Sequence, residues 1–469
     1  MTKDFIDIIK SRGFLHQMTD EDGLRTLLKT HGQKAYIGFD CTAKSLHVGS
    51  LLQIMLLRWW QTCGHTPIVL LGGGTTKIGD PSGKDESRPK LDDAAIAENM
   101  ASLKNVFAKF IDFDGDKALM VNNDDWLKDL NYVNFLRDYG RHFSVNRMLT
   151  MDSVKLRLER EQPLSFLEFN YMIFQAYDFV ELNKRYNCRL QMGGEDQWGN
   201  ILQGIDLGTS LKALDKSSWK KARTKLSAKD IKKTSIQSEV YKNNAGIRIF
   251  SAGTVSQEVD GQYEVEYNFV DNNFGIISPL LTTSSGAKMG KTAAGAVWLN
   301  ADLLKPYDYW QFWRNTEDGD VIRFLKLFTE IELSQIAEYE SWVGSAKIND
   351  AKIILATEAT AMLHGRDEAE RASKTAAETF AGRGVSDDLP TIEILNAEIE
   401  AGAGLTRWIV KANFASSGSD ARRQIENNGI SVNDTKITDP NYRLTSADFA
   451  QGFAKLSKGK KQHVLVKVK

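Results

Sequence analysis

One stretch decides the fold: residues 34–74, KAYIGFDCTAKSLHVGSLLQIMLLRWWQTCGHTPIVLLGGG. Lys34 to Asp40 has the pattern of a short strand, and Leu51 to Gln61 is an apolar run of helical length. Thr66 to Leu71 is a continuous apolar strand that ends in three glycines. This order predicts an α/β fold with a Rossmann-like parallel sheet, whose ligands bind at the carboxyl ends of the strands.

Changes in residue pattern along the sequence divide the rest of the chain into predicted domains. We expect the parallel-sheet domain at residues 1–299, a helical domain at 300–381, a linker at 382–404 and a small α+β domain at 405–469. Residues 209–273 indicate an inserted subdomain, basic from Lys212 to Lys233, with a hairpin from Val255 to Val270 around Asp260-Gly261. The predicted later elements are helices at Tyr307 to Asn315, Asp320 to Thr329, Leu333 to Val343 and Ala351 to Leu363, and a strand at His463 to Val468.

Composition excludes several classes of protein. The chain has 469 residues, of which 42% are hydrophobic and 26% charged, values typical of a globular protein and not of a disordered, collagen-like or coiled-coil chain. No stretch has the ~20 apolar residues of a membrane span, and the first residues lack a secretory signal. Cys41, Cys63 and Cys188 have no metal-binding spacing, so we expect reduced thiols, no metal site and a cytoplasmic location.

The charge is unevenly distributed. The net charge is −1, but residues 405–469 carry +7 and the other residues −8. A basic end on an acidic body is the asymmetry expected when one module contacts a polyanion, although a solvated lysine-rich end gives the same count.

Two short motifs have the chemistry of phosphate binding. His47-Val48-Gly49-Ser50 lies where a loop enters the helix that starts near Leu51, and a helix N-terminus favours phosphate. Lys288-Met289-Gly290-Lys291-Thr292 places two lysines three residues apart in a flexible loop, where they can neutralise charge on a polyphosphate. Taken alone, the first motif is also typical of an ordinary capped helix, and the second is also typical of a solvated lysine loop.

A third set of polar residues has the spacing of a pocket. Tyr171, Gln175 and Asp178 lie at i, i+4 and i+7, so on a helix they share one face. Tyr36, Gly38 and Asp40 alternate along the predicted strand. If these polar groups are buried, they need hydrogen-bond partners, which a small zwitterionic ligand with a phenol group would supply. The alternative is that they form a polar helix face that packs on the sheet of the same domain.

Taken together, these motifs resemble those of class I aminoacyl-tRNA synthetases, and specifically the bacterial type of the tyrosyl-tRNA synthetase family. The further matches are YIGFDCT from Tyr36, GDPSGK from Gly79 and GGEDQWGN from Gly193. The resemblance covers residues ~10–208, ~274–345 and the basic end, and leaves the 209–273 insertion unmatched. It implies a ligase that activates L-tyrosine with ATP and transfers it to tRNA(Tyr), without an editing domain.

The resemblance also implies roles for individual residues. Tyr36 and Asp178 would bind the tyrosine hydroxyl, Asp80, Tyr171 and Gln175 its α-ammonium group with Asp40 nearby, and Gln197 its carboxyl end. Gly38, Gly49, Ser50, Gly193 and Asp196 would contact ATP, and the residues implied around the leaving pyrophosphate are Thr42, His47, Lys84, Arg88, Lys288, Lys291 and Thr292. The family uses Mg²⁺ with ATP and holds no tightly bound cofactor.

The reaction implied is in-line attack of the tyrosine carboxylate on the α-phosphorus of ATP, for which positioning and charge stabilisation suffice. Two positions depart from the commonest family pattern: Ser50 stands where a second His is usual, and Ile37 stands where some relatives have a polar ribose contact.

The C-terminal residues resemble an S4-like RNA-binding module. Its candidate RNA contacts are Arg422, Arg423, Lys458, Lys460 and Lys461, with a capped helix bearing solvated arginines as the alternative. The resemblance further implies a homodimer formed through the catalytic domain.

Some alternatives remain open from the sequence. The insertion can be a surface ornament, an extra RNA contact or a partner site. The whole chain can be an RNA-binding protein whose catalysis has lapsed, although the complete pocket argues against this. A tryptophanyl-tRNA synthetase shares the fold, but the Tyr36 and Asp178 pair suits a phenol.

Overall fold

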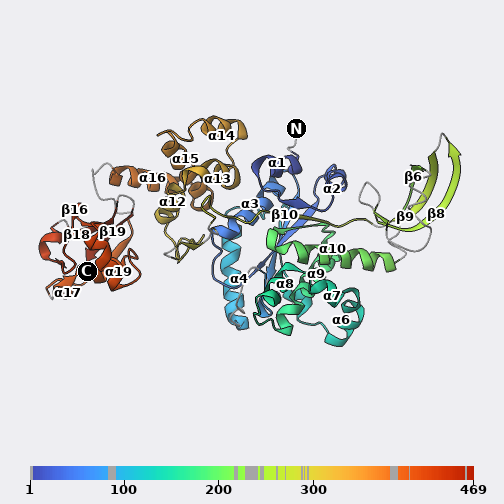
Figure 1. Cartoon of the computed structure of the whole chain (residues 1–469), viewed down its shortest axis with the longest axis horizontal. Coiled ribbons are helices and arrows are strands. Elements are labelled where there is room, and N and C mark those ends of the chain that lie inside the picture. The colour runs from blue at the N-terminus through green and yellow to red at the C-terminus, as the bar shows by residue number, and fades with distance from the viewer. Residues whose placement is uncertain are drawn as a thin grey trace. The chain divides into compact units, whose positions relative to one another are not determined.

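The chain forms two compact units, Met1–Lys288 and Met289–Lys469 (Figure 1). The computed structural model describes residues 4–82, 91–215, 220–227, 241–242, 248–259, 262–269, 271–286, 289, 291–292, 295–380, 389–400, 402–450, 452–459 and 462–469. None of the helices within these ranges is both long and apolar enough to span a bilayer.

The first unit is built on a six-stranded sheet of order β1-β10-β5-β2-β3-β4. All neighbours pair in parallel except β1, which is antiparallel to β10. This confirms the predicted α/β class, and the two strands predicted first lie next to each other at its centre. The strands are β1 (Gln17–Met18), β2 (Lys34–Asp40), β3 (Thr66–Gly72), β4 (Leu119–Asn122), β5 (Leu190–Gly194) and β10 (Phe274–Ser278).

The strand order reverses between β2 and β5. From β2 the chain adds β3 and β4 on one side, whereas β5 and β10 lie on the other. Backbone pairing between β2 and β5 is confined to Ala35 opposite Leu190 and Tyr36 opposite Gln191. Gly38 is consequently exposed although it lies inside a strand. This β2–β5 opening is the topological switch point at which open α/β sheets bind ligands.

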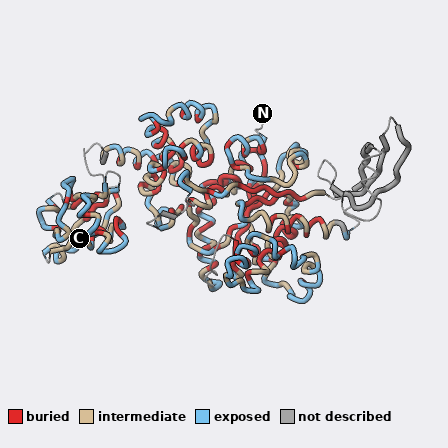
Figure 2. The backbone as a smooth tube through the Cα atoms, viewed as in Figure 1, coloured by how far each residue is buried: buried red, intermediate tan, exposed pale blue. Residues whose placement is uncertain are grey.

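Helices cover both faces of the sheet, and the buried residues concentrate in its strands (Figure 2). Tyr36, Ile68 and Leu70 pack in one cluster with residues of α9 and α10. Side chains alternate along a strand, so Ile37 and Val69 face the opposite layer, where α3 packs against β2 and β3. The helices of this unit are α1 (Phe5–Arg12), α2 (Glu21–Leu28), α3 (Val48–Thr62), α4 (Asp93–Phe107), α5 (Asp124–Leu127), α6 (Tyr132–Asp138), α7 (Val145–Met148), α8 (Asp152–Glu159), α9 (Phe166–Tyr186) and α10 (Trp198–Leu214).

The start of α9 is fixed by a capping box and a buried ion pair. Ser165 accepts from the backbone N–H of Glu168, and the Glu168 carboxylate accepts from the backbone of Ser165. Arg157 of α8 lies 3.4 Å from the same carboxylate and also donates to the carbonyl of Pro163. These contacts set where the helix begins, and therefore the face on which its later polar residues lie.

The insertion folds as a separate four-stranded sheet of order β6-β9-β8-β7. Val259 pairs with Gln262, as expected for a two-residue Asp-Gly turn, although the turn itself lies outside the described residues. The insertion begins later than predicted because α10 continues through Leu214, and Lys212 belongs to that helix. Its strands are β6 (Lys220–Ser227), β7 (Tyr241–Lys242), β8 (Arg248–Val259) and β9 (Gln262–Phe269).

The second unit contains the predicted helices. They are α12 (Pro306–Arg314), α13 (Val321–Phe328), α14 (Leu333–Glu340), α15 (Ile348–His364) and an additional helix, α16 (Arg366–Phe380). The β-hairpin of the KMGKT motif precedes them, with β11 (Lys291–Thr292) antiparallel to β12 (Gly295–Ala296).

The C-terminal sheet begins earlier in the chain than the sequence predicts. β13 (Thr391–Ile394) falls within the predicted linker, yet it pairs in parallel with β19 (Gln462–Val468). Residues from 391 onward therefore fold with this sheet, whose core includes Trp408. Its other elements are α17 (Asn396–Glu400), β14 (Ala403–Gly404), α18 (Leu405–Lys411), α19 (Gly418–Glu426), β15 (Ile430–Val432), β16 (Thr435–Lys436), β17 (Arg443–Leu444) and β18 (Phe453–Lys458).

The buried ion pair at the start of α9 makes a testable contribution to stability. Glu168→Ala leaves the guanidinium of Arg157 buried without its carboxylate, so we expect the free energy of unfolding to fall by about 3–5 kcal/mol in urea denaturation. The matched control is Glu159→Ala, which removes an exposed partner of Lys155 on α8 and should cost less than about 1 kcal/mol. Equal losses in the two variants would contradict this assignment.

Candidate active site

The carboxylate of Asp178 is buried in α9 between two donors from one segment. Asn123 Nδ2 donates to Oδ2 at 3.0 Å, and Trp126 Nε1 donates to Oδ1 at 2.8 Å. Burial raises the pKa of Asp178 to about 7, although both hydrogen bonds act in the opposite direction. The side chain is therefore a buried acceptor whose charge is only partly compensated by the protein.

Tyr36 of β2 presents a buried phenol to the same place. Its ring is 1% exposed, and within the described part of the chain its hydroxyl has no hydrogen-bond partner. Burial, and next the charge of Asp178, raise the pKa of this phenol well above its ordinary value. An unpaired buried hydroxyl beside a buried carboxylate has the chemistry to bind a ligand group that both donates and accepts a hydrogen bond.

A chain of hydrogen bonds joins Asp178 to Asp40 across the ends of three strands. Asn123 also donates to Thr75 Oγ1 at 3.0 Å, and Thr75 donates to Asp40 Oδ1 at 2.9 Å. Tyr171, two turns before Asp178 on α9, donates to Asp40 Oδ2 at 3.2 Å. The structure thus brings together Asp40, Tyr171 and Asp178, which the sequence had grouped only by spacing.

A second polar group lies around the start of α10. Gln197 Nε2 donates to Asp80 Oδ2 at 3.0 Å. The buried Asn200 donates through one nitrogen to Gln175 Oε1 at 3.0 Å and to Gln197 Oε1 at 3.2 Å. Asn200 therefore connects three of the predicted ligand-binding residues, which come from a loop, α9 and the turn after β5.

Sequence reasoning missed Thr75, Asn123, Trp126 and Asn200 as site residues. Asn122 ends β4 and Asn123 directly follows it, and polar residues at the carboxyl end of a parallel strand were the available signal. Asn200 stood inside the quoted GGEDQWGN motif without an assigned role. These four residues matter because they hold the predicted ligand-binding side chains in place through hydrogen bonds.

His47 begins α3. Its Nδ1 accepts from the backbone N–H of Gly49 at 3.0 Å, so the neutral ring carries its proton on Nε2. Ser50 donates its backbone N–H to the carbonyl of His47. Thr42 is exposed in the loop between β2 and α3.

The two predicted glycines near the opening differ in their surroundings: Gly38 is open to a ligand, whereas Gly193 is buried and packs closely against the protein itself. Gly38 is exposed on β2, and a Cβ on Gly193 of β5 would lie 3.2 Å from both Gln197 and Ile201. Asp196 is exposed in the turn that follows β5.

Several predicted residues lie outside the described ranges. They are Lys84, Arg88, Lys288, Lys460 and Lys461. For Lys291 and Thr292 the structure describes only the backbone, as β11.

The predicted RNA contacts of the C-terminal domain differ in their surroundings. Arg422 and Arg423 are exposed on α19, and Arg423 pairs with Asp420 at 2.8 Å. Lys458 instead donates to the backbone carbonyl of Phe414 at 2.6 Å, so it has a structural contact within the domain.

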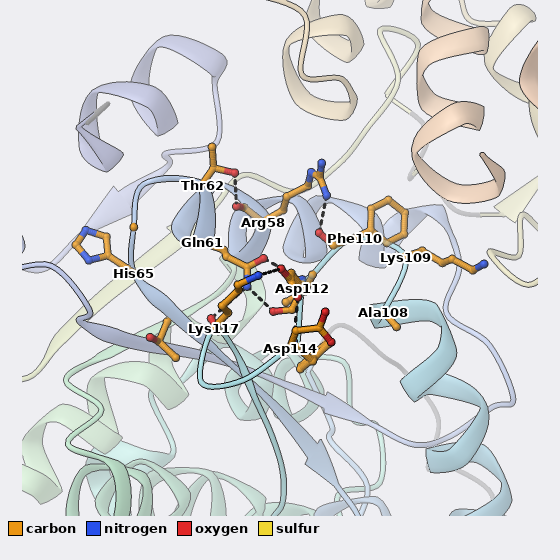
Figure 3. A pocket seen from close by; sticks show the side chains of 14 residues that line it. Arg58, Gln61, Thr62, His65, Ala108, Lys109, Phe110, Asp112, Asp114 and Lys117 are labelled. Carbon is orange, nitrogen blue, oxygen red and sulfur yellow. Dashed lines mark hydrogen bonds and ion pairs between the residues drawn. The ribbon is translucent and has the colours of Figure 1, made fainter. Parts of the chain in front are cut away.

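A pocket of about 810 Å³ lies away from these residues (Figure 3). It is lined by the end of α3, the loop before β3 and residues 108–114 and 117, which precede β4. Gln61 bridges it by donating to the carbonyls of Asp112 and Lys117. This pocket lies where β3 and β4 begin, whereas ligands of parallel sheets bind where strands end. No residue predicted for the active site lines it.

Two family models match the chain. The model described as class I tRNA synthetases (W and Y) matches residues 28–231 and 254–381, and the tyrosine–tRNA ligase SYY-like C-terminal domain matches residues 383–466. The tyrosine–tRNA ligase of Methylocella silvestris is 51% identical over 467 residues, 99% of this chain and 98% of the relative. That of Brucella suis is 50% identical over the same shares. The chain belongs to the bacterial tyrosyl-tRNA synthetase family.

Solved structures of this family are also similar. A C-terminally truncated mitochondrial tyrosyl-tRNA synthetase from Aspergillus nidulans superposes with a TM-score of 0.61 and 28% identity, covering 80% of this chain and 94% of that one. The enzyme from Coccidioides posadasii gives 0.60 and 29%, covering 79% and 91%.

The comparisons correct one expectation about the insertion. Residues 209–273 were predicted to lack a counterpart, but the synthetase model skips only residues 232–253. Bacterial tyrosyl-tRNA synthetases that cover 99% of the chain share most of this segment. Family membership also removes the tryptophanyl alternative, because the C-terminal model and the relatives are tyrosine-specific by name.

The raised pKa of Asp178 predicts a pH-dependent stability. Because the folded pKa of about 7 exceeds the ordinary 3.8, ionisation is penalised in the fold, and stability is lost as pH rises through this range. Relative to Asp178→Asn, we expect wild-type unfolding free energy to fall by about 4 kcal/mol between pH 4 and pH 8, measured by urea denaturation without ligands. For the control Asp125→Asn, at an exposed position, the unfolding free energy should change with pH as it does in wild type. The same pH dependence in Asp178→Asn would refute the assignment.

Proposed function

We propose that the β2–β5 opening binds L-tyrosine and ATP side by side and forms tyrosyl-adenylate there. As a tyrosine–tRNA ligase, the chain activates tyrosine with ATP and transfers the tyrosyl group to tRNA(Tyr) for protein biosynthesis. The observation that carries the proposal for the site is the Tyr36 hydroxyl, buried without a partner in the described residues, beside the Asp178 carboxylate.

The phenol of the substrate completes this pair. Its hydroxyl donates to Asp178, which Asn123 and Trp126 hold in place, and accepts from Tyr36. Phenylalanine would leave both protein groups buried and unpaired. A site of this kind rejects the analogue without the hydroxyl by roughly 10⁴–10⁵-fold, a factor for which tyrosyl-tRNA synthetases are the known example.

The α-ammonium group of the substrate needs three acceptors. We assign them to oxygens of Asp80, Tyr171 and Gln175, with Asp40 next to Tyr171 adding negative charge. Gln197, which donates to Asp80, contacts the carboxyl end. The zwitterion is then fixed at both ends, with its carboxylate directed toward ATP.

The nucleotide occupies the other side of the opening. Gly38, Gly49, Ser50, Gly193 and Asp196 contact the nucleoside part, where absent or short side chains allow close approach. ATP enters as its Mg²⁺ complex, since the triphosphate itself supplies the oxygen ligands that Mg²⁺ prefers.

The reaction forms a bond between a tyrosine carboxylate oxygen and the α-phosphorus and breaks the bond from that phosphorus to the bridging oxygen. That bridging oxygen and its electron pair leave with pyrophosphate. The Nε2–H of His47 and the N-terminus of α3 face developing negative charge. The other groups that we assign to the pyrophosphate are Thr42, Lys84, Arg88, Lys288, Lys291 and Thr292.

We assign tRNA binding to the C-terminal domain and to the helices before it. The support is the match of a tyrosine–tRNA ligase C-terminal model, the +7 charge and the exposed Arg422 and Arg423. The bacterial identity of the relatives supports a place in the cytoplasm.

An exposed apolar surface supports the homodimer. Nine of the fifteen large hydrophobic side chains that are exposed in the described residues lie within residues 132–167, over α6, α7, α8 and the start of α9 (Figure 1). A concentration of exposed apolar side chains in one segment is typical of an interaction site. These residues are Tyr132, Val133, Leu136, Val145, Leu149, Leu156, Leu158, Phe166 and Leu167.

Amino-acid-dependent exchange of labelled pyrophosphate into ATP tests the activation step. We expect exchange with tyrosine alone among the twenty amino acids. Tyr36→Phe should reduce the preference for tyrosine over phenylalanine roughly tenfold, because one hydrogen bond to the hydroxyl is lost. Tyr177→Phe is the control, since this neighbouring phenol packs against Phe135 and Tyr139 instead. An unchanged preference in Tyr36→Phe would refute the assigned phenol pocket.

Charge on the apolar surface tests the dimer. Val133 and Phe166 are 72% and 70% exposed, so replacing both with Asp should leave each chain folded but separate the subunits. Sedimentation velocity should show a dimer for wild type and a monomer for the double variant. Val343→Asp, an exposed position in the second unit, should remain dimeric. A wild-type monomer would overturn the proposal.

A further inference from the structure

The backbone carbonyl of Cys41 is held by a buried side chain from α4. Cys41 directly follows β2 and is completely buried. Asn99 Nδ2 donates to its carbonyl oxygen at 2.8 Å, and Asn99 is only 6% exposed. An amide is costly to bury unless it makes hydrogen bonds, so this bond accounts for a polar residue on the buried face of α4. The other buried residues of this helix are apolar, namely Ile96, Leu103, Val106 and Phe107.

The backbone N–H of Cys41 is fixed as well. It donates at 2.7 Å to Oγ1 of Thr76, which lies in the short helix η1 (Thr75–Lys77) after β3. Thr75, the residue before it, donates to Asp40 Oδ1. Each of the two peptide units that flank Cys41 is therefore bound from outside its own loop, one by α4 and the other by η1.

The planarity of the peptide bond carries this restraint to Thr42. The Cys41 carbonyl and the Thr42 N–H belong to one planar unit, and the described residues contain no cis peptide bond, so the N–H points away from Asn99. The orientation of this plane sets the direction in which the Thr42 side chain leaves the backbone. Because Thr42 is exposed, that direction depends on the backbone restraint and not on packing of the side chain.

Other contacts between α4 and this region are of a different kind. Glu98, next to Asn99, pairs with Lys44 at 2.5 Å, but both side chains are more than half exposed, and such pairs contribute little. Phe39 of β2 packs against Phe107 of α4 with ring centroids 4.8 Å apart, which is an apolar contact. Asn99 is therefore a buried and directional link from α4 to the loop after β2.

We propose that Asn99 is a positioning residue for tyrosine activation, which orients the Cys41–Thr42 peptide so that the Thr42 hydroxyl donates to the pyrophosphate as it leaves. This inference rests on the proposed contact between Thr42 and pyrophosphate. Negative charge on the leaving group grows in the transition state, so a donor that is aimed in advance lowers the barrier more than it strengthens the binding of ATP. Loss of Asn99 therefore slows activation and leaves the affinities for both substrates nearly unchanged.

Single-turnover formation of tyrosyl-adenylate by the full chain, measured by rapid quench with labelled ATP, tests this role. Asn99→Ala should lower the rate constant at saturating substrates roughly three- to tenfold, the range for one neutral hydrogen bond. The concentrations of ATP and tyrosine that give half the maximal rate should change less than about twofold. Asn99→Leu, which has a similar volume but no donor, should behave in the same way.

A double-mutant cycle with Thr42 tests the route by which Asn99 acts. Thr42→Ala should itself lower the rate constant for adenylate formation. Adding Asn99→Ala to Thr42→Ala should cause little further loss, because the side chain that Asn99 positions is already absent.

Two further residues of α4 provide the controls. Glu98→Ala removes the exposed pair with Lys44 and should leave the rate constant unchanged. Val106→Ala removes buried apolar contacts of the same helix, so it should lower the unfolding temperature without lowering the rate constant. Together these variants separate loss of the hydrogen bond to Cys41 from a general weakening of α4.

The outcomes are distinguishable. A wild-type rate constant in Asn99→Ala and Asn99→Leu overturns the inference, and so does a full additional loss when Asn99→Ala is added to Thr42→Ala. An equal loss of rate in Val106→Ala would show a structural role of α4 and also overturn it. A wild-type rate constant in Thr42→Ala, or no tyrosine-dependent adenylate formation by the wild type, would instead overturn the proposed function on which the inference rests.

Discussion

The burial of the Asp178 carboxylate constrains the first unit more than any other single feature. Removing a carboxylate from water is costly, and its pKa of about 7 shows that Asn123 and Trp126 repay only part of that cost. The two donors come from the end of β4 and from α5, so that segment must dock against α9. Asn123 also accepts from the backbone N–H of Gly74, which ties the glycines after β3 to the same arrangement.

On the proposed assignment, the β2–β5 opening lies between the tyrosine and ATP sites. On the β2 side, Asp40, Tyr171 and Asp178 form a connected polar wall that suits the amino acid. On the other side lie the end of β5 and the N-terminus of α3, to which we assign the nucleotide. Backbone pairing between β2 and β5 ends at Tyr36, so the residues at the carboxyl ends of these two strands are not bonded to each other and can face a ligand.

The sequence correctly predicted the features that depend on local residue patterns. Lys34 to Asp40 and Thr66 to Leu71 are strands as predicted, and the continuous apolar run of the second is buried on both faces of the sheet. Tyr171, Gln175 and Asp178 do share α9. The sequence did not reveal that Asn123 contacts Asp178, because that contact joins residues 55 positions apart and depends on tertiary docking. Lys458 was predicted to contact RNA, and the sequence did not reveal its bond to the carbonyl of Phe414, because that residue is remote in sequence.

The charges of the pocket couple recognition of the two ends of tyrosine. The negative charge of Asp40 contributes to raising the pKa of Asp178, so the two carboxylates oppose each other's ionisation. An ammonium group bound beside Asp40 and Asp80 offsets that repulsion and favours the ionised form of Asp178. Ionised Asp178 is the better acceptor for the phenol. On the assigned roles, an amino acid with only the ammonium or only the hydroxyl therefore forfeits part of the other contact as well, which strengthens selection for tyrosine beyond the sum of two independent sites.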